Sequence, residues 1–372
     1  MAVGYLAYTE QLPIPLSQDY DLHTLLANPL MDIWFAWDST WYQMLVEQGY
    51  QTAAEVPQGP VPVQANWAFF PLYPWLSAML SSATGWPSEV SLLLVANVAF
   101  VFALYLVYCE VQELHNERTG QLAAFLLLAW PGTHFFSSAY TESLFLLIVV
   151  GVFRLARQER FLWAALVAAL GALTRSPGIM LVFPIAFYAW STWAGKNKSR
   201  QNIRTGFIFV FSGAGARTFL ICCIPLAALS CFMAYLYTLT GDPLAFATVQ
   251  EAWGRGARNP ILEFIRPFVA LSTIPAEQWM DFMTMWLIPI PLLLLLRERS
   301  WPHFSFAFIL VLLAITAGVV SLNRQTLVIF PIIVVLSKWL ASNPKASRIL
   351  VPAVACAGLL MMAFWSAGYG VV

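Results

Sequence analysis

A succession of long apolar runs, separated by short polar segments, constrains this chain more than any other feature of its sequence. A helix that crosses a bilayer needs about 20 mostly apolar residues, because only its own backbone can satisfy its hydrogen-bonding groups in hydrocarbon. Only 10% of the residues are charged, against roughly 25% in soluble domains. The candidate crossings are residues 88–109, 121–138, 140–156, 161–175, 178–194, 218–239, 280–296, 303–321, 326–341 and 348–367. The sequence therefore predicts an all-α, polytopic transmembrane protein with about ten crossings.

The charged residues are distributed unevenly between the predicted connections. If alternate connections lie on opposite sides of the membrane, 14 of the 19 Lys and Arg residues fall on one side and 14 of the 19 Asp and Glu residues on the other. Because short loops rich in Lys and Arg remain in the cytoplasm, the basic side is predicted to be cytoplasmic. The outer face then receives residues 1–87, 132–143, 175–178, 240–279 and 321–324.

The whole chain, residues 1–372, is expected to form one transmembrane domain. Residues 1–87 are interpreted as a first outer segment with a helix lying on the membrane surface at 67–84, and residues 88–372 as the bundle with an outer loop at 240–279. The first 30 residues lack the basic n-region of a signal peptide. This arrangement predicts a multi-pass protein whose chemistry takes place at the outer face.

Cysteine and histidine patterns indicate no metal site. The five cysteines lie in apolar runs and the four histidines are scattered, without the spacing of zinc ligands or of a disulfide framework. We therefore expect free thiols, no cofactor and no dedicated metal site, although a divalent ion could share the charge of a bound phosphate. The net charge is zero, so no general field attracts nucleic acid, and none is expected as a partner.

Asp38 lies in the densest group of polar and aromatic residues, with Trp37 before it and Tyr42 after it. A carboxylate in such a partly dehydrated place can be tuned to remove a proton from a sugar or alcohol hydroxyl. The structural alternative is that Asp38 caps an interfacial helix and the aromatic rings anchor it. The residues alone leave both interpretations open.

Glu142 and Arg175 lie at the edges of predicted crossings. A charge at such depth is costly unless it is partnered, which makes both residues candidates for a functional site. For Glu142 the alternative is a structural role as an acid at a helix N-terminus. The partner of Arg175 could be Glu142, Asp38 or a phosphate, which suits the planar guanidinium.

Three further arginines, Arg255, Arg258 and Arg324, lie in predicted outer segments. The first two flank glycines in a loop that could wrap a phosphate or a sugar, although many surface loops contain such residues. Arg324 is the only charge between two crossings, and its alternative role is to extend toward lipid headgroups.

The order of these segments resembles the PIG-V-type family, the GPI mannosyltransferase II group of the GT-C membrane glycosyltransferases. The resemblance spans about 140 residues in four short motifs. These motifs are Trp37-Asp38-Ser39 with Tyr42 and Gly49-Tyr50; Ala68-Phe69-Phe70-Pro71 with Pro74; Tyr140-Thr141-Glu142-Ser143-Leu144-Phe145; and Arg175-Ser176 with Gly178.

The resemblance implies a specific activity. Such enzymes transfer a sugar, typically mannose, from a dolichyl or polyprenyl phosphate, with inversion, on the side of the membrane away from the cytoplasm. An acid of the first outer loop acts as general base, which corresponds here to Asp38. Glu142 and Arg175 are then expected to orient groups or bind phosphate, and the substrate-binding set also includes Trp37, Tyr42, Arg255, Arg258 and Arg324.

The sequence departs from the family at its start, where a membrane helix normally precedes the first outer loop and only the apolar Met1–Tyr8 remains. The short loops are like those of prokaryotic members, which predicts a plasma-membrane location and an acceptor that can be a lipid, a glycan or a protein. Asp32 remains an alternative base to Asp38. Two other functions are alternatives: a lipid-sugar transporter or flippase, which would distribute polar residues at several depths, and a non-catalytic assembly subunit.

Overall fold

The computed structural model describes residues 33–57, 63–197, 202–269, 274 and 278–366. Every regular element in these ranges is a helix, which confirms the predicted all-α class. Met1–Tyr8 and Asp32, which entered the sequence predictions, lie outside the described residues.

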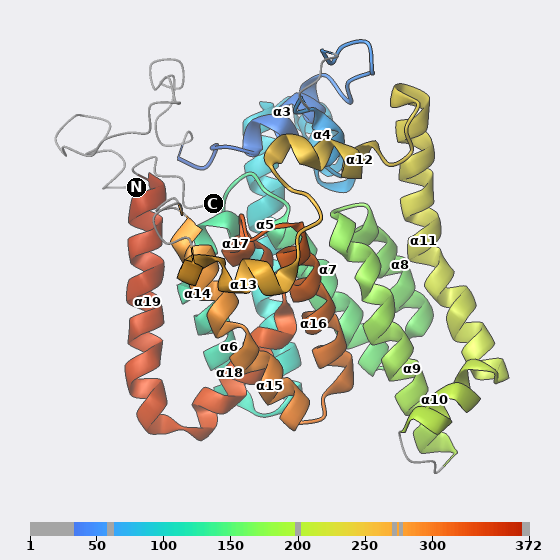
Figure 1. Cartoon of the computed structure of the whole chain (residues 1–372), viewed down its shortest axis with the longest axis vertical. Helices are drawn as coiled ribbons and strands as arrows, with labels where there is room; N and C mark the ends of the chain where they lie inside the picture. Colours follow the sequence, from blue (N-terminus) through green and yellow to red (C-terminus); the bar gives the residue numbers. More distant parts are fainter. Residues whose placement is uncertain (1–32, 58–62, 198–201, 270–273, 275–277, 367–372) are drawn as a thin grey trace.

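The described chain passes ten times between the two ends of a helical bundle (Figure 1). The passes are α5 (Ser88–Leu114), α6 (Glu117–Ala129), α7 (Glu142–Arg157), α8 (Phe161–Ala172), α9 (Val182–Lys196), α11 (Gly213–Thr240), α14 (Trp279–Leu287) continued by α15 (Pro289–Arg297), α16 (Trp301–Ala317), α18 (Phe330–Ser342) and α19 (Pro344–Ser366). By length and composition, five segments of the described residues can cross a membrane: Ser88–Leu114, Ser176–Lys196, Gly213–Thr240, Trp279–Arg297 and Pro344–Ser366. The prediction of a polytopic integral membrane protein is confirmed.

Helix α7 lies in the interior of the bundle, against α5, α8 and α9. It is apolar on several faces, and side chains such as Leu146, Val149 and Phe153 are fully buried, as expected for a helix surrounded by others. Ala164 and Ala168 are buried in α8, where small side chains allow neighbouring helices to approach closely. This packing fixes the position of the first residue of α7.

The predicted crossing 121–138 is shorter than expected. Helix α6 ends at Ala129, and Pro131 and Gly132, the latter with a φ of 96°, turn the chain into the short helix η2 (Thr133–Phe136). Proline lacks a backbone donor and glycine accepts a positive φ, so neither residue continues a helix. The turn places the start of α7 beside other loops at one end of the bundle.

One end of the bundle carries most of the short helices (Figure 1). They are η1 (Asn66–Ala68), α3 (Ser39–Glu47), α4 (Leu72–Thr84), η3 (Ser176–Leu181), α12 (Ala245–Thr248), η4 (Val249–Trp253), α13 (Pro260–Val269) and α17 (Leu322–Thr326). The predicted surface helix 67–84 is therefore divided into η1 and α4, and the described residues of the predicted loop 240–279 contain three short helices, α12, η4 and α13.

The opposite end of the bundle carries the described basic clusters. Arg154 and Arg157 at the end of α7 share Glu110 and Glu113 of α5 in ion pairs, and Lys338 of α18 pairs with Glu298 at 2.6 Å. The amphipathic helix α10 (Ile203–Val210) also lies at this end (Figure 1). Arg154, Arg157 and Lys338, which the sequence predicts on one side of the membrane, therefore lie at the same end of the bundle.

Candidate functional site

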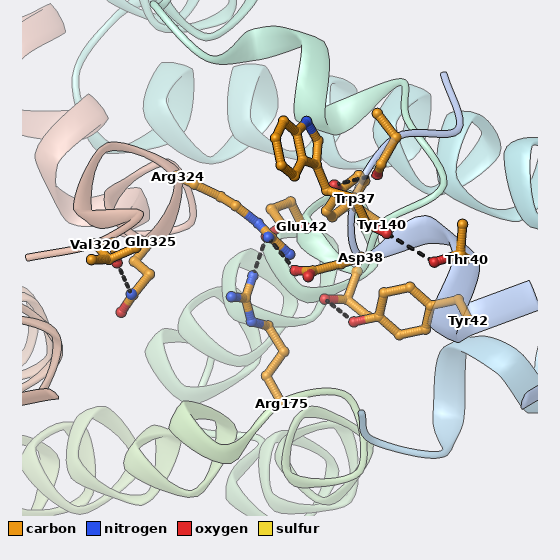
Figure 2. Close-up of polar contacts among 12 residues, drawn as sticks. Trp37, Asp38, Thr40, Tyr42, Tyr140, Glu142, Arg175, Val320, Arg324 and Gln325 are labelled. Atoms are coloured by element: carbon orange, nitrogen blue, oxygen red, sulfur yellow. Dashed lines mark hydrogen bonds and ion pairs between the residues drawn. The ribbon is translucent and has the colours of Figure 1, made fainter. Parts of the chain in front are cut away.

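A polar pocket with a volume of about 560 Å³ lies at the end of the bundle where the short helices gather. Five predicted site residues line it, and they come from segments far apart in the sequence: Asp38, Tyr42, Arg175, Arg255 and Arg324. Phe69 and Trp253 add aromatic walls. Figure 2 shows Asp38, Arg175 and Arg324 converging with Glu142.

Asp38 precedes α3 and occupies its N-cap position, but its side chain accepts no hydrogen bond from the helix. Instead, Oδ2 accepts a hydrogen bond from Nη1 of Arg324 at 2.6 Å. The Asp38 side chain is 22% exposed, so one side of the carboxylate remains open to the pocket. The carboxylate of Asp38 therefore binds Arg324 and does not cap α3, which differs from the structural alternative.

Glu142 is the first residue of α7 and is completely buried. Its Oε1 accepts hydrogen bonds from Nη1 of Arg175 and from Nε of Arg324, both at 2.5 Å. The carboxylate of Glu142 therefore lies at a helix N-terminus, as the structural alternative expects, and it also holds two arginines. Of the three candidate partners of Arg175, which were Glu142, Asp38 and a phosphate, the structure shows Glu142.

Arg324 is the centre of this network, and its side chain is only 5% exposed. Its guanidinium carbon lies 4.3 Å from the centroid of the Tyr140 ring and 5.3 Å from that of Phe135. Burial lowers the pKa of Arg324, but Glu142 and Asp38 outweigh burial and raise it well above its usual value. Arg324 does not extend toward lipid headgroups, so that alternative is wrong.

The helix that carries Arg324 is held by Asp281, a residue that sequence reasoning missed. Asp281 is buried in α14, and its two carboxylate oxygens accept the backbone N–H groups of Ser321 at 2.9 Å and of Asn323 at 2.8 Å. These groups belong to the start of α17, where backbone donors lack partners within the helix. A signal was present in the sequence, because Asp281 is an acid inside a predicted crossing.

Arg175 is presented by the turn between α8 and η3. A Cβ atom on Gly178 would overlap the backbone carbonyl of Gly171 in α8, so only glycine permits this close approach. The backbone therefore packs against α8 just after Arg175, and the side chain of Arg175 points toward Glu142 (Figure 2).

Arg255 follows η4 and lines the pocket from the loop that crosses the end of α16. Its Nη1 donates to Oε1 of Gln250 at 3.1 Å, and its buried Nε finds no acceptor among the described residues. Burial lowers the pKa of Arg255. Within the described part of the chain, Arg255 forms no ion pair, so it has a charge and a donor available for a ligand.

Trp37 and Arg258 do not belong to the residues that line the pocket. Arg258 pairs with Glu263 at 3.2 Å and donates to the carbonyl of Gly254 at 3.1 Å, while its own backbone N–H donates to Thr316. These contacts hold the loop that presents Arg255. The carbonyl of Trp37 accepts a hydrogen bond from Thr40.

The charges around the pocket favour an anion. Three arginines and the carboxylates of Asp38 and Glu142 give a net charge of +3 − 2 = +1. No three His, Cys, Asp or Glu residues within the described ranges are placed to hold a metal ion together. The two carboxylates of the network are instead paired with arginines.

The fold and the site together define an integral membrane protein with a pocket of net positive charge at one end of its helical bundle. Residues 68–227 match the family model described as dolichyl-phosphate-mannose-protein mannosyltransferase. This match supports the GT-C superfamily of membrane glycosyltransferases. It does not support the PIG-V-type group specifically. A search of curated proteins gave no match.

Several solved membrane enzymes have a similar overall fold at low identity. The apo oligosaccharyltransferase of Archaeoglobus fulgidus is 13% identical, with a TM-score of 0.47 over 99% of this chain and 56% of that chain. ArnT from Cupriavidus metallidurans is 11% identical in its apo state, with a TM-score of 0.47 over 91% of this chain and 74% of that chain. This chain therefore spans about half of the length of the archaeal enzyme.

Proposed function

We propose that this protein transfers a sugar, mannose, from a polyprenyl or dolichyl phosphate to an acceptor hydroxyl with inversion at the outer face of the membrane. The observation that carries the proposal is that one pocket holds a partly open carboxylate, Asp38, its buried ion-pair partner Arg324, and two further arginines, Arg175 and Arg255. The family model matched by residues 68–227 supports the choice of donor. The sequence resemblance to the PIG-V-type family supports inversion and the location of the site.

In this mechanism the acceptor hydroxyl lies against Asp38, which removes its proton. The acceptor oxygen attacks C1 of the sugar from the face opposite to the phosphate, and the bond between C1 and the phosphate oxygen breaks. The products are the glycosylated acceptor and the lipid phosphate, and the proton on Asp38 later passes to water. The reaction is therefore a single displacement assisted by a general base.

The arginines stabilise the departing phosphate. Arg255 offers a buried Nε without an acceptor in the described structure, and Arg175 lines the same pocket while still paired with Glu142. Fixed cations that face the place where negative charge develops lower the barrier without reorganisation during the reaction. Glu142 acts as a positioning residue, because it is buried and forms ion pairs with Arg175 and Arg324.

Tyr42 supplies a polar group beside the base. Burial, followed by the charge of Glu142, raises the pKa of Tyr42 to about 12, so its hydroxyl remains protonated at neutral pH. It donates a hydrogen bond to Oγ1 of Thr141 at 3.4 Å. With Phe69 and Trp253, it forms an aromatic wall suited to a sugar ring.

The first test is sugar transfer by the purified protein with polyprenyl phosphate mannose and a panel of acceptors. The Asp38→Asn variant is expected to lose turnover by about 10²- to 10⁴-fold, the usual contribution of general-base catalysis, while it still binds donor. Glu47→Gln is the matched control, because Glu47 is on the same helix and bonds with Gln43 and Ser88 outside the pocket.

Full turnover in Asp38→Asn would exclude Asp38 as the base. A folded wild-type protein that binds no lipid-phosphate sugar would exclude the proposed donor class, and would favour a transport or scaffold function instead.

A further inference from the structure

A second polar pocket, of about 410 Å³, lies between α8, α9, α10 and α11. It is lined by the N-terminal parts of α8 and α11 and by the C-terminal part of α9. The other ends of α8 and α9 lead to Arg175 and to η3 at the catalytic pocket. The second pocket is therefore at the opposite end of the bundle and cannot share a ligand headgroup with the first.

Basic side chains outnumber acidic side chains in the second pocket. Arg160, Lys196 and Arg217 line it together with one carboxylate, Glu159, which pairs with Lys196 at 2.8 Å. The net charge is +3 − 1 = +2. In the described part of the chain, Arg160 and Arg217 form no ion pair, so both guanidinium groups are available to an anion. Helix α8 begins at Phe161 in this pocket, and its positive end adds to the same field.

The surface around the pocket is apolar and belongs in lipid. On α10, Phe207 is 65% exposed and Phe211 at its end is 86% exposed, whereas Phe209 is buried against Trp193 with ring centroids 5.6 Å apart. Phe219 on α11 is 68% exposed. The exposed phenylalanines of α10 can therefore contact lipid at the membrane surface.

Trp163 and Trp193 line the pocket among the basic residues. Tryptophan is enriched at the level of lipid headgroups, where its ring is apolar and its N–H is polar. The basic rim therefore lies at headgroup depth, and exposed residues such as Leu162 and Leu166 continue along α8 toward the hydrocarbon core.

We propose that this pocket binds the phosphate group of an anionic phospholipid in the leaflet opposite the catalytic pocket. Each guanidinium can donate two parallel hydrogen bonds to phosphate oxygens, and basic pockets between membrane helices are suited to anionic headgroups. The acyl chains lie along the exposed apolar sides of α8 and α11. The lipid joins α10 to the ends of three crossings, and this site acts independently of the proposed transferase reaction.

The test compares lipid binding in nanodiscs made of phosphatidylcholine with or without phosphatidylglycerol. We expect the wild type to retain phosphatidylglycerol selectively, measured by mass spectrometry of the lipids that remain bound after detergent washing, and to unfold at a higher temperature in its presence. In Arg160→Gln/Arg217→Gln, the affinity for phosphatidylglycerol should fall by roughly 30-fold, the effect of removing two charges near a membrane surface.

Two matched variants make the result specific. Arg297→Gln/Arg299→Gln removes the same charge from exposed positions at the same end of the bundle, outside the pocket, and should keep the selectivity. Arg160→Lys/Arg217→Lys should keep most of it, because the charges remain.

Three results would each overturn the proposal: equal retention of both lipids by the wild type, equal loss of selectivity in Arg297→Gln/Arg299→Gln, or stabilisation in phosphatidylcholine discs by inorganic phosphate alone as large as that by phosphatidylglycerol. The last result would identify a site for free phosphate rather than for a lipid.

Discussion

Two residues next to the site adopt left-handed backbone conformations although neither is glycine. Trp37 has a φ of 58° and immediately precedes Asp38, and Ser321 has a φ of 64° and precedes the helix that carries Arg324. Each such residue costs roughly 1–2 kcal/mol for an L-amino acid. Both partners of the Asp38–Arg324 ion pair thus follow strained turns, as is common where a functional side chain must be directed precisely at a partner.

Ser321→Gly is predicted to stabilise the protein. Glycine adopts a positive φ without steric cost, and the substitution also removes a buried hydroxyl that has no partner among the described groups. We expect a gain of about 1 kcal/mol, measured as a higher midpoint of thermal unfolding in detergent. Ser321→Ala separates the two effects, because it removes the hydroxyl but keeps the strain; an equal gain in both variants would show that the strain contributes nothing.

Asp281→Asn is predicted to reduce turnover although Asp281 does not line the pocket. An amide can accept only one of the two backbone N–H groups that Asp281 holds, so α17 and Arg324 should shift. We expect turnover to fall by about 10- to 100-fold and stability by about 1–3 kcal/mol.

The control for Asp281 is Asn116→Ala, which removes the N-cap of α6 at the other end of the bundle. This substitution should lower the free energy of unfolding by about 1 kcal/mol and leave turnover unchanged. An Asp281→Asn enzyme with unchanged turnover at saturating donor would show that Arg324 does not depend on this support.

The sequence predicted which residues approach one another but not how they pair. Asp38, Glu142, Arg175 and Arg324 were candidates because charges near apolar runs need partners. Arg324 contacts Asp38 across 286 positions and Glu142 across 182, and no local pattern links residues at such separations. Asp281 was missed although it is an acid inside a predicted crossing, because the backbone N–H groups that it binds cannot be identified from residue types.

At the scale of elements, helix existence was predicted better than helix ends. The run 218–239 corresponds to α11 (Gly213–Thr240), which begins earlier because Ser212 caps it by accepting the N–H of Gly215. Helix α10 was not predicted, because it is too short to cross a membrane and its apolar residues depend on neighbouring helices for burial. Tertiary packing, rather than apolar run length, sets these boundaries.

The turn between α6 and α7 gives the protein a predicted dependence on pH. Burial, followed by the charge of Arg324, lowers the pKa of His134 in this turn to about 3. The unfolded chain, with an ordinary pKa near 6.5, binds the proton more readily than the folded protein. Stability contributed by neutral His134 is therefore present above about pH 6.5 and is lost as the pH falls toward 3.

His134→Phe is expected to make the unfolding midpoint less sensitive to acid. Between pH 7.5 and pH 5, His134 should lower the free energy of unfolding of the wild type by about 2 kcal/mol. A phenylalanine can keep the ring contacts with Phe135 and Trp365, and it has no proton to bind. Parallel pH profiles of the two proteins between pH 7.5 and 5 would show that other groups control acid unfolding.

At the scale of the molecule, the distribution of charge predicts that turnover does not require a divalent metal. The described carboxylates of the site, Asp38 and Glu142, are already engaged by arginines, and arginines can supply the positive charge beside the leaving phosphate. We expect unchanged turnover after dialysis against EDTA. Activity that is lost on chelation and restored by Mg²⁺ or Mn²⁺ would contradict this, with a metal-dependent glycosyltransferase treated in parallel as control.

The ion-pair network also implies an order of events during synthesis. Arg175 follows Glu142 by only 33 residues, so the α7–α8 hairpin can enter the membrane with its buried carboxylate already neutralised. The ion pair of Asp38 forms much later, because its partner Arg324 is synthesised 286 residues after it. The ion-pair network of the site can therefore be completed only after the segment that carries Arg324 has joined the earlier helices.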